Sequence, residues 1–296
     1  MKTKHKIALA RLAWRGMRTV RTFSGAGMTG QFSRGGLAWK LDLDEGIDFS
    51  IFLLGAFEPG TVRFYRRALR PGDIVFDIGA NIGAHTLPFA QCVAPNGKVF
   101  AFEPTQFAYG KLLENISLNP QLKELIVPNH MFLTAPGLQD APGEIYSSWP
   151  LKPAPELHEK HLGQLRLVGE ASIGTLDEYC REKKITRLDW VKIDVDGNEM
   201  TVLQGAADTL KQLQPSLIME LSPYACREAG HSFEELVKLV RNFGYDLYDL
   251  ENGSTLPSDA ADLDALIPDG SGLNAVLKPA AQVHGLRPSP EPADDH

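Results

Sequence analysis

Two glycines four residues apart stand in the run Asp77-Ile78-Gly79-Ala80-Asn81-Ile82-Gly83, directly after an apolar segment. Glycines let a backbone bend sharply and approach a ligand closely, and the helix expected next offers free N–H groups and a positive dipole end. An acid at Asp77 would repel a phosphate, but it suits a ligand that carries an amine or a cationic group. The spacing also differs from G-x-G-x-x-G, because Asn81 occupies the middle position, and this disfavours a dinucleotide.

A second acid, Glu103, follows the apolar segment 98–102, about 20 residues after the turn. In a doubly wound sheet such an acid stands at the end of the neighbouring strand, where its two oxygens can accept hydrogen bonds from two ribose hydroxyls. Asp77, the glycine turn and Glu103 together predict a site for an adenosine-like nucleoside that lacks phosphate.

A third group of charged residues belongs to the expected strand 190–195. Strand alternation puts Lys192, Asp194 and Asp196 on one side of the chain, and Gly197 turns it into the next helix. Charges within a central strand are costly to bury unless they are paired, so they are expected at the mouth of a ligand site. A purely structural set of ion pairs remains the alternative.

The elements that would position these residues alternate between short apolar strands and longer helices, which indicates βαβ units and a parallel sheet. The fold is therefore expected to be a doubly wound α/β sandwich. Expected helices are 62–69, 84–92, 106–118, 176–183, 199–213 and 233–243. Expected strands are 37–43, 74–76, 98–102, 125–127, 130–133, 190–195, 217–221 and 246–250, with 274–277 as a last edge strand. Segment 47–54 reads as a strand or a short helix, 23–36 as a loop, and 134–172 as irregular with short strands near 144–148 and 165–168.

The N-terminal part is basic, while the remainder of the chain is acidic. Residues 1–40 carry nine Lys or Arg and no acid, so of the 30 basic residues 21 remain against 37 acidic ones. Residues 2–22 read as an amphipathic helix with Ile7, Ala10, Trp14, Met17 and Val20 on one stripe. Such a helix either packs on its own domain or rests on an anionic membrane surface or a partner. We expect residues 1–59 to form a basic helix-and-strand extension, 60–280 the main domain, and 281–296 a disordered tail.

The composition excludes several classes of protein. A net charge of -7 argues against a nucleic-acid partner for the whole chain. The three cysteines are far apart and lie at no zinc or disulfide spacing. No apolar stretch approaches the length of a membrane span. We therefore expect a soluble, cytoplasmic protein, with peripheral contact at the inner membrane face left open; no pattern predicts an oligomeric state.

The glycine turn, Phe102-Glu103-Pro104 and Thr175-Leu176-Asp177 resemble motifs of the FkbM family of S-adenosylmethionine-dependent methyltransferases. The run Lys192-Ile193-Asp194-Val195-Asp196-Gly197-Asn198-Glu199 also fits, although the family usually has Glu at position 196 and Ala at 198. The resemblance implies a class I methyltransferase, Rossmann-like fold with a mostly parallel seven-stranded sheet. It further implies S-adenosylmethionine as cofactor and methylation of a hydroxyl on a sugar, glycan or secondary-metabolite acceptor.

The resemblance also implies roles for individual residues. Asp77 would lie near the cofactor's amino group, Glu103 would hold its ribose, and Phe107 or Phe132 would lie along the adenine. The full cofactor set is Asp77, Gly79, Ala80, Asn81, Gly83, His85, Thr86, Glu103, Pro104 and Phe107. A hydroxyl acceptor needs a base, so the expected acceptor-handling set is Asp194, Asp196, Lys192, Glu199 and Glu220. These acids could also bind Mg²⁺, which prefers oxygen ligands, but no metal site is predicted.

Two alternatives remain. A nicotinamide-dependent oxidoreductase could use a similar sheet, but Asp77 and Asn81 do not suit its phosphate turn. A non-catalytic, methyltransferase-like module that binds a ligand or partner would not need the charged set around Asp194.

Overall fold

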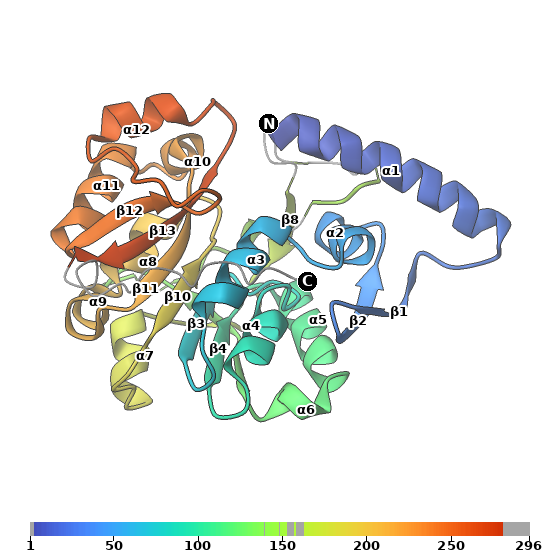
Figure 1. Cartoon of the computed structure of the whole chain (residues 1–296), viewed down its shortest axis with the longest axis horizontal. Helices are drawn as coiled ribbons and strands as arrows, with labels where there is room; N and C mark the ends of the chain where they lie inside the picture. The colour runs from blue at the N-terminus through green and yellow to red at the C-terminus, as the bar shows by residue number, and fades with distance from the viewer. Residues whose placement is uncertain (1–2, 139, 148, 153–156, 158–162, 281–296) are drawn as a thin grey trace, which may run out of the picture.

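A computed structural model describes residues 3–138, 140–147, 149–152, 157 and 163–280, with side chains from residue 9 onward. The tail expected at 281–296 lies outside these residues. Figure 1 shows the main sheet in the left and central part of the molecule, with the N-terminal helix at the upper right beyond α2.

A seven-stranded sheet forms the centre of the fold, in the order β12-β13-β11-β10-β3-β4-β5. All strands run parallel except β13, which is antiparallel to both β11 and β12. The strands are β3 (Ile74–Ile78), β4 (Lys98–Phe102), β5 (Ile126–Asn129), β10 (Trp190–Ile193), β11 (Ser216–Leu221), β12 (Tyr245–Asp249) and β13 (Leu273–Pro279). The expected mostly parallel, seven-stranded α/β sheet is confirmed. The strand order reverses between β3 and β10, and ligands bind at such a switch point beyond the carboxyl ends of the strands.

Helices cover both faces of this sheet because its strands bury alternate residues on opposite sides. Val75 of β3 joins one core cluster, while its neighbour Phe76 joins the other. The first core is covered by α3 (Pro59–Ala68), α4 (Thr86–Val93), α5 (Gln106–Ser117) and α6 (Pro120–Lys123). The second is covered by α7 (Leu176–Glu182), α8 (Glu199–Gln204), α9 (Ala207–Leu213), α10 (Pro223–Glu228), α11 (Phe233–Asn242) and α12 (Ala260–Leu266).

The N-terminal extension packs onto the first core. It comprises α1 (Thr3–Phe23), the hairpin of β1 (Thr29–Arg34) and β2 (Leu37–Asp42), and α2 (Gly46–Leu54). Trp14 of α1 is buried, and its indole N–H donates to Asp44 Oδ1 at 3.1 Å. The side chain of Asn119 bonds both the N–H and the carbonyl of Ala38, which fixes the hairpin against the sheet domain.

Short strands outside the main sheet complete the fold. β6 (Met131–Leu133) pairs with β9 (Ser172–Gly174), and β7 (Glu144–Ser147) pairs with β8 (Gln164–Leu167). The β7–β8 hairpin is held against the extension, because Gly46 N–H donates to Trp149 O at 2.9 Å and Arg166 forms a 3.0 Å ion pair with Glu45. The extension therefore supports this hairpin.

Several expectations from the sequence are corrected. Segment 273–279 is not an edge strand but lies between β11 and β12, and its alternate side chains are buried in both cores. Residues 29–34 form a strand rather than a loop, since Gly35 and Gly36 adopt the positive φ angles of a tight hairpin turn. The helix expected at 199–213 is two helices, and a Cβ on the intervening Gly205 would lie 2.0 Å from Thr134 O.

Val20 does not share the packed stripe of α1, because 64% of its surface is exposed. Segment 47–54 was expected to be either a strand or a short helix; it belongs to the helix α2, residues 46–54.

Candidate active site

A cavity of about 320 Å³ opens beyond the carboxyl ends of β3, β4 and β10, at the switch point of the sheet. Its volume lies within the usual range for small-molecule sites. The sheet side of its wall consists of Ile78, Gly79, Asn81, Phe102, Glu103, Pro104, Asp194, Val195, Asp196, Asn198 and Val202. The remaining wall consists of Met131, Phe132, Leu133, Ile145, Tyr146, Ser147, Ala225, Glu228 and Ala229.

Gly79 lets the ends of β3 and β10 touch. Its φ angle is +83°, and a Cβ there would lie 1.9 Å from the carbonyl oxygen of Asp194. Asp194 N–H in turn donates to Ile78 O at 3.1 Å. No side chain fits between these two backbones, so the glycine predicted from the sequence is required by the packing of the cavity floor.

Glu103, which directly follows β4, binds the backbone of the glycine turn after β3. Only 3% of its surface is exposed. Its carboxylate accepts hydrogen bonds from Asn81 N–H at 2.8 Å, Thr105 N–H at 2.8 Å and Thr105 Oγ1 at 2.5 Å. Burial nevertheless raises the pKa of this carboxyl. A carboxylate has about four acceptor positions, so Glu103 keeps acceptor capacity beyond these three bonds.

Lys192 forms the centre of a charged layer beneath the cavity. It is 3% exposed, and its Nζ lies 2.8 Å from Asp194 Oδ2. Burial alone would lower the pKa of Lys192, but Asp194, Asp77 and Glu58 together raise it above its ordinary value. Lys192 is therefore a charged ammonium paired within the fold, and it does not line the cavity.

Asp77 and Thr86 also lie in this layer. Thr86 Oγ1 donates to Asp77 Oδ2 at 2.6 Å, and both residues are fully buried. The other oxygen, Oδ1, is buried without a hydrogen-bond partner in the described part of the chain. Direct cofactor contact was expected of both residues, but neither lines the cavity.

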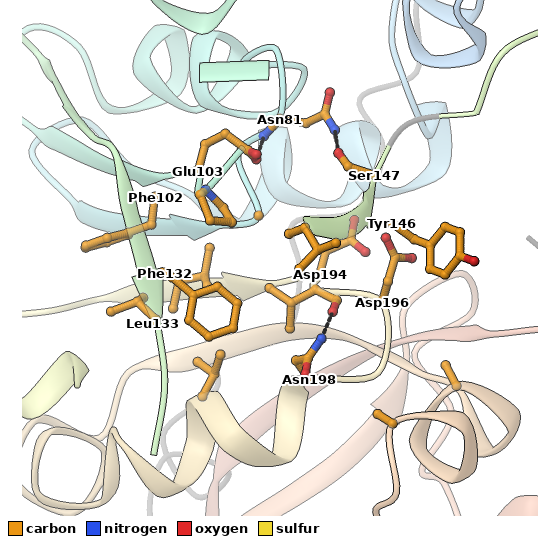
Figure 2. A pocket seen from close by; sticks show the side chains of 18 of the residues that line it. Asn81, Phe102, Glu103, Phe132, Leu133, Tyr146, Ser147, Asp194, Asp196 and Asn198 are labelled. Carbon is orange, nitrogen blue, oxygen red and sulfur yellow. Dashed lines mark hydrogen bonds between the residues drawn. The ribbon is translucent and has the colours of Figure 1, made fainter. Parts of the chain in front are cut away.

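Asp196 reaches the cavity from the loop after β10. It adopts a φ of +49°, which is uncommon for a residue other than glycine, and its side chain is exposed in the open cavity. The surrounding protein and the nearby carboxylates of Asp194 and Glu199 raise its pKa to about 7. Figure 2 shows Asp194 and Asp196 on the same side of the cavity.

Glu199 and Glu220 stand behind this wall rather than in it. Glu199 is buried and accepts from the N–H groups of Val195 and Gly197, both at 3.3 Å, so it fixes the loop that carries Asp196. Burial raises the pKa of Glu199 to about 7 despite these bonds. Glu220 packs on Gly272, where a Cβ would lie 1.8 Å from its Oε1, and burial raises its pKa well above the usual value.

The other expected residues occupy different positions. His85 is buried, with Nδ1 3.4 Å from Tyr65 Oη and Nε2 3.6 Å from Glu58 Oε2. Phe107 lies under the Arg166 guanidinium at 3.9 Å and outside the cavity wall, whereas the alternative Phe132 belongs to that wall. Ala80 and Gly83 also lie outside the wall; Gly83 has a φ of +88° and packs on Leu112.

One side of the cavity was missed by the sequence analysis. Ser147 of β7 accepts a 3.3 Å hydrogen bond from the Asn81 amide, and Tyr146 beside it faces the Asp196 side of the cavity (Figure 2). Glu228 comes from α10, a six-residue helix that was not expected. Pro223 at the start of α10 could have indicated this helix in the sequence, because proline favours the first turn of a helix.

No group of three or more His, Cys, Asp or Glu among the described residues is arranged to hold a metal ion. Nothing in this part of the chain supports the Mg²⁺ left open above.

Comparison with known proteins identifies the family. A family model described as the methyltransferase FkbM domain matches residues 77–247, which is more than half of the chain. The chain belongs to the FkbM methyltransferase family. The resemblance stated from the sequence is thus confirmed, and every site residue predicted from it lies within the matched segment.

Three curated methyltransferases are distantly similar in sequence. A hexuronic acid methyltransferase from Haloferax volcanii is 26% identical over 62% of this chain and 67% of its own length. A 2-O-methyltransferase from Sinorhizobium fredii is 28% identical over 48% of this chain and 60% of its own length. The 31-O-demethyl-FK506 methyltransferase of Streptomyces tacrolimicus is 28% identical over 60% of this chain and 74% of its own.

Among solved structures, the FkbM methyltransferase of Methylobacillus flagellatus superposes with a TM-score of 0.42 at 14% identity, covering 78% of this chain and 55% of that one.

Proposed function

We propose that this protein transfers a methyl group from S-adenosylmethionine to a hydroxyl group of a sugar, glycan or secondary-metabolite acceptor. The observation that carries the proposal is the cavity at the switch point, where the Gly79 turn, Glu103 and Asp196 meet in a member of the FkbM family.

The residues present fit the cofactor. The backbone at Gly79 lets a ligand approach the strand end, Glu103 offers acceptor positions for ribose hydroxyls, and Phe132 offers an apolar surface for a flat base. When bound, S-adenosylmethionine supplies a methyl group on a positively charged sulfur. The carboxylates of Asp194 and Asp196 at the wall suit that positive charge.

The protein's own work is then positioning and proton transfer. Holding an acceptor oxygen in line with the methyl group can supply roughly 7–11 kcal/mol of the barrier. Asp196 takes the proton of the acceptor hydroxyl, since it faces the cavity and its raised pKa of about 7 is near the operating pH. Asp194, held by Lys192, orients the acceptor rather than acting as the base.

The charge of the wall indicates the class of acceptor. The charged side chains among the described lining residues are all carboxylates, namely Glu103, Asp194, Asp196 and Glu228. Carboxylates repel anionic acceptors, so we propose an uncharged or amine-bearing polyhydroxyl acceptor. This differs from the hexuronic acid in the name of the Haloferax volcanii relative.

The test has two stages. Calorimetry should detect binding of S-adenosylmethionine and no binding of NAD, and the opposite preference would support the oxidoreductase. Release of S-adenosylhomocysteine is then measured with matched glycosides of a neutral hexose, an amino sugar and a uronic acid. Turnover of the uronate alone would contradict the proposed acceptor class, and binding without turnover across a broad acceptor panel would favour a non-catalytic module.

A further inference from the structure

The N-terminal helix α1 has two apolar faces, and the structure covers one of them. Ala10, Trp14 and Met17 face the core beside α2. A second stripe is exposed, with Leu9 at 58%, Leu12 at 67%, Val20 at 64% and Phe23 at 89% of their surfaces. At 3.6 residues per turn these four positions fall within an arc of about 100°, the width of an apolar helix face.

The sequence alone does not reveal this second face, because its pattern places Val20 on the same stripe as Trp14. Figure 1 shows α1 along the upper right margin of the molecule, apart from the main sheet. None of the four stripe residues lines the cavity, so the stripe needs its own explanation. Large apolar side chains gathered on one exposed helix face mark an interaction surface.

Charge indicates what covers the stripe. Residues 2–21 contain seven Lys or Arg and no acid, and Arg15 and Arg18 are exposed on α1. A second copy of the chain would bring two such basic helices together, which like-charge repulsion disfavours. An anionic surface with an apolar interior satisfies both the cations and the Leu and Phe side chains.

We propose that α1 docks the protein onto a bilayer surface that contains anionic phospholipids. The helix lies in the plane of the interface, with the stripe of Leu9, Leu12, Val20 and Phe23 in the acyl boundary and arginines at the headgroups. No described helix is long and apolar enough to cross a membrane, so the contact is peripheral. The packed face, through Trp14, keeps the domain fixed to the docked helix.

The test is co-sedimentation of the full chain with vesicles of phosphatidylcholine alone and of mixed phosphatidylcholine and phosphatidylglycerol. Binding is expected to the mixed vesicles and to fall sharply when salt rises from about 0.1 M to about 1 M. The double variant Leu12→Glu/Phe23→Glu should reduce partitioning about a hundredfold or more. Arg15→Gln should reduce it about fivefold.

Leu266→Glu on α12 is the matched control, because Leu266 is 58% exposed and lies on a different part of the surface. It should bind vesicles as the unmodified protein does, and all variants should keep the same affinity for S-adenosylmethionine and the same helix content by circular dichroism. Absence of binding to mixed vesicles, or unchanged binding by the double variant, would overturn the proposal. A dimer in analytical ultracentrifugation that the double variant abolishes would assign the stripe to a second copy instead.

Discussion

The ammonium of Lys192 and the carboxylate of Asp194 form a 2.8 Å ion pair across the floor of the cavity, with the lysine buried and the aspartate facing the ligand space. This pair divides the roles of the two neighbouring acids. Asp194 is paired with a fixed cation, whereas desolvation by the surrounding protein and the nearby carboxylates raise the pKa of Asp196. The two residues should therefore respond differently to the same substitution.

Asp196→Asn should lower turnover on the order of 10²–10⁴-fold, because a general base contributes about that much, while cofactor affinity changes little. In the unmodified enzyme turnover should decrease as the pH falls below about 7, since the base must be deprotonated. Both are measured by S-adenosylhomocysteine release across a pH series. A variant with normal turnover would remove Asp196 from the mechanism.

Asp194→Asn should affect the stability of the fold more than Asp196→Asn does. It leaves the buried ammonium of Lys192 without its closest carboxylate, so we expect a loss of about 1–3 kcal/mol in the free energy of unfolding. Chemical denaturation of this variant and of Asp196→Asn measures the difference. Equal stability of the two variants would contradict the structural role of the pair.

Glu199→Gln should change how stability depends on pH. The folded-state pKa of Glu199 is about 7, above its ordinary 4.5, so between these values the folded state holds a proton that the unfolded state has lost. The stabilisation from this group is full below pH 4.5 and is lost as the pH rises through about 7. The variant should therefore remove about 3 kcal/mol of the decline in unfolding free energy across this range. Denaturant titrations at several pH values test this, and an unchanged slope would contradict it.

Gly79→Ala should be strongly destabilising. The added Cβ would lie 1.9 Å from Asp194 O in a left-handed backbone conformation, so a loss of at least about 2 kcal/mol is expected, together with loss of cofactor binding. Gly110→Ala in α5 is the matched control. No atom lies within 4 Å of its added Cβ, and the change should stabilise by about 0.5–1 kcal/mol.

Glu103→Ala should weaken S-adenosylmethionine binding by about 1.5–3 kcal/mol, the range for hydrogen bonds to a charged group. It also removes the acceptor of Asn81 N–H, so part of this loss comes from the turn itself. Thr105→Val is a control for the packing around Glu103, because it removes one bond to the carboxylate and the cap bond from Ala108 N–H, but leaves the bond from Asn81 N–H in place, at a residue outside the cavity wall. Calorimetry in which both variants lose equal affinity would reject the ribose role.

Trp14→Ala should cost about 3–5 kcal/mol, because it empties a buried site and breaks the bond to Asp44. Cofactor affinity should remain, since none of the side chains described for α1, from Leu9 to Phe23, lines the cavity. Leu12→Ala, at an exposed position of the same helix, should change stability by less than about 0.5 kcal/mol. Loss of cofactor binding by a folded Trp14 variant would instead make the extension part of the site.

The sheet and the part of the cavity wall at its strand ends could be predicted because their signals are local. Gly79, Glu103 and Asp194 each follow an apolar strand, and strand ends in a doubly wound sheet converge on one edge. Sequence spacing also placed Asp77 and Lys192 at that edge. It could not show that they lie one layer below the cavity, since the depth of a side chain depends on how neighbouring strands pack.

The opposite wall could not be predicted. Tyr146 and Ser147 come from a segment rich in proline and glycine without a clear period, and their position depends on contacts of Trp149 and Arg166 with the extension. The sequence pattern places Val20 on the stripe of Trp14, but α1 carries two apolar stripes and Val20 lies on the exposed one.

The insertion of β13 between β11 and β12 has a consequence for biosynthesis. In the described sheet β12 is joined to the remaining strands through β13, whose residues 273–279 are made after those of both neighbours. At about 5–20 residues per second, the ribosome needs about 1–5 s to add the intervening residues 250–272. During that interval β11 presents an open edge that can pair with a strand of another nascent chain. Slow decoding of this stretch should therefore lower the yield of folded protein through co-translational aggregation.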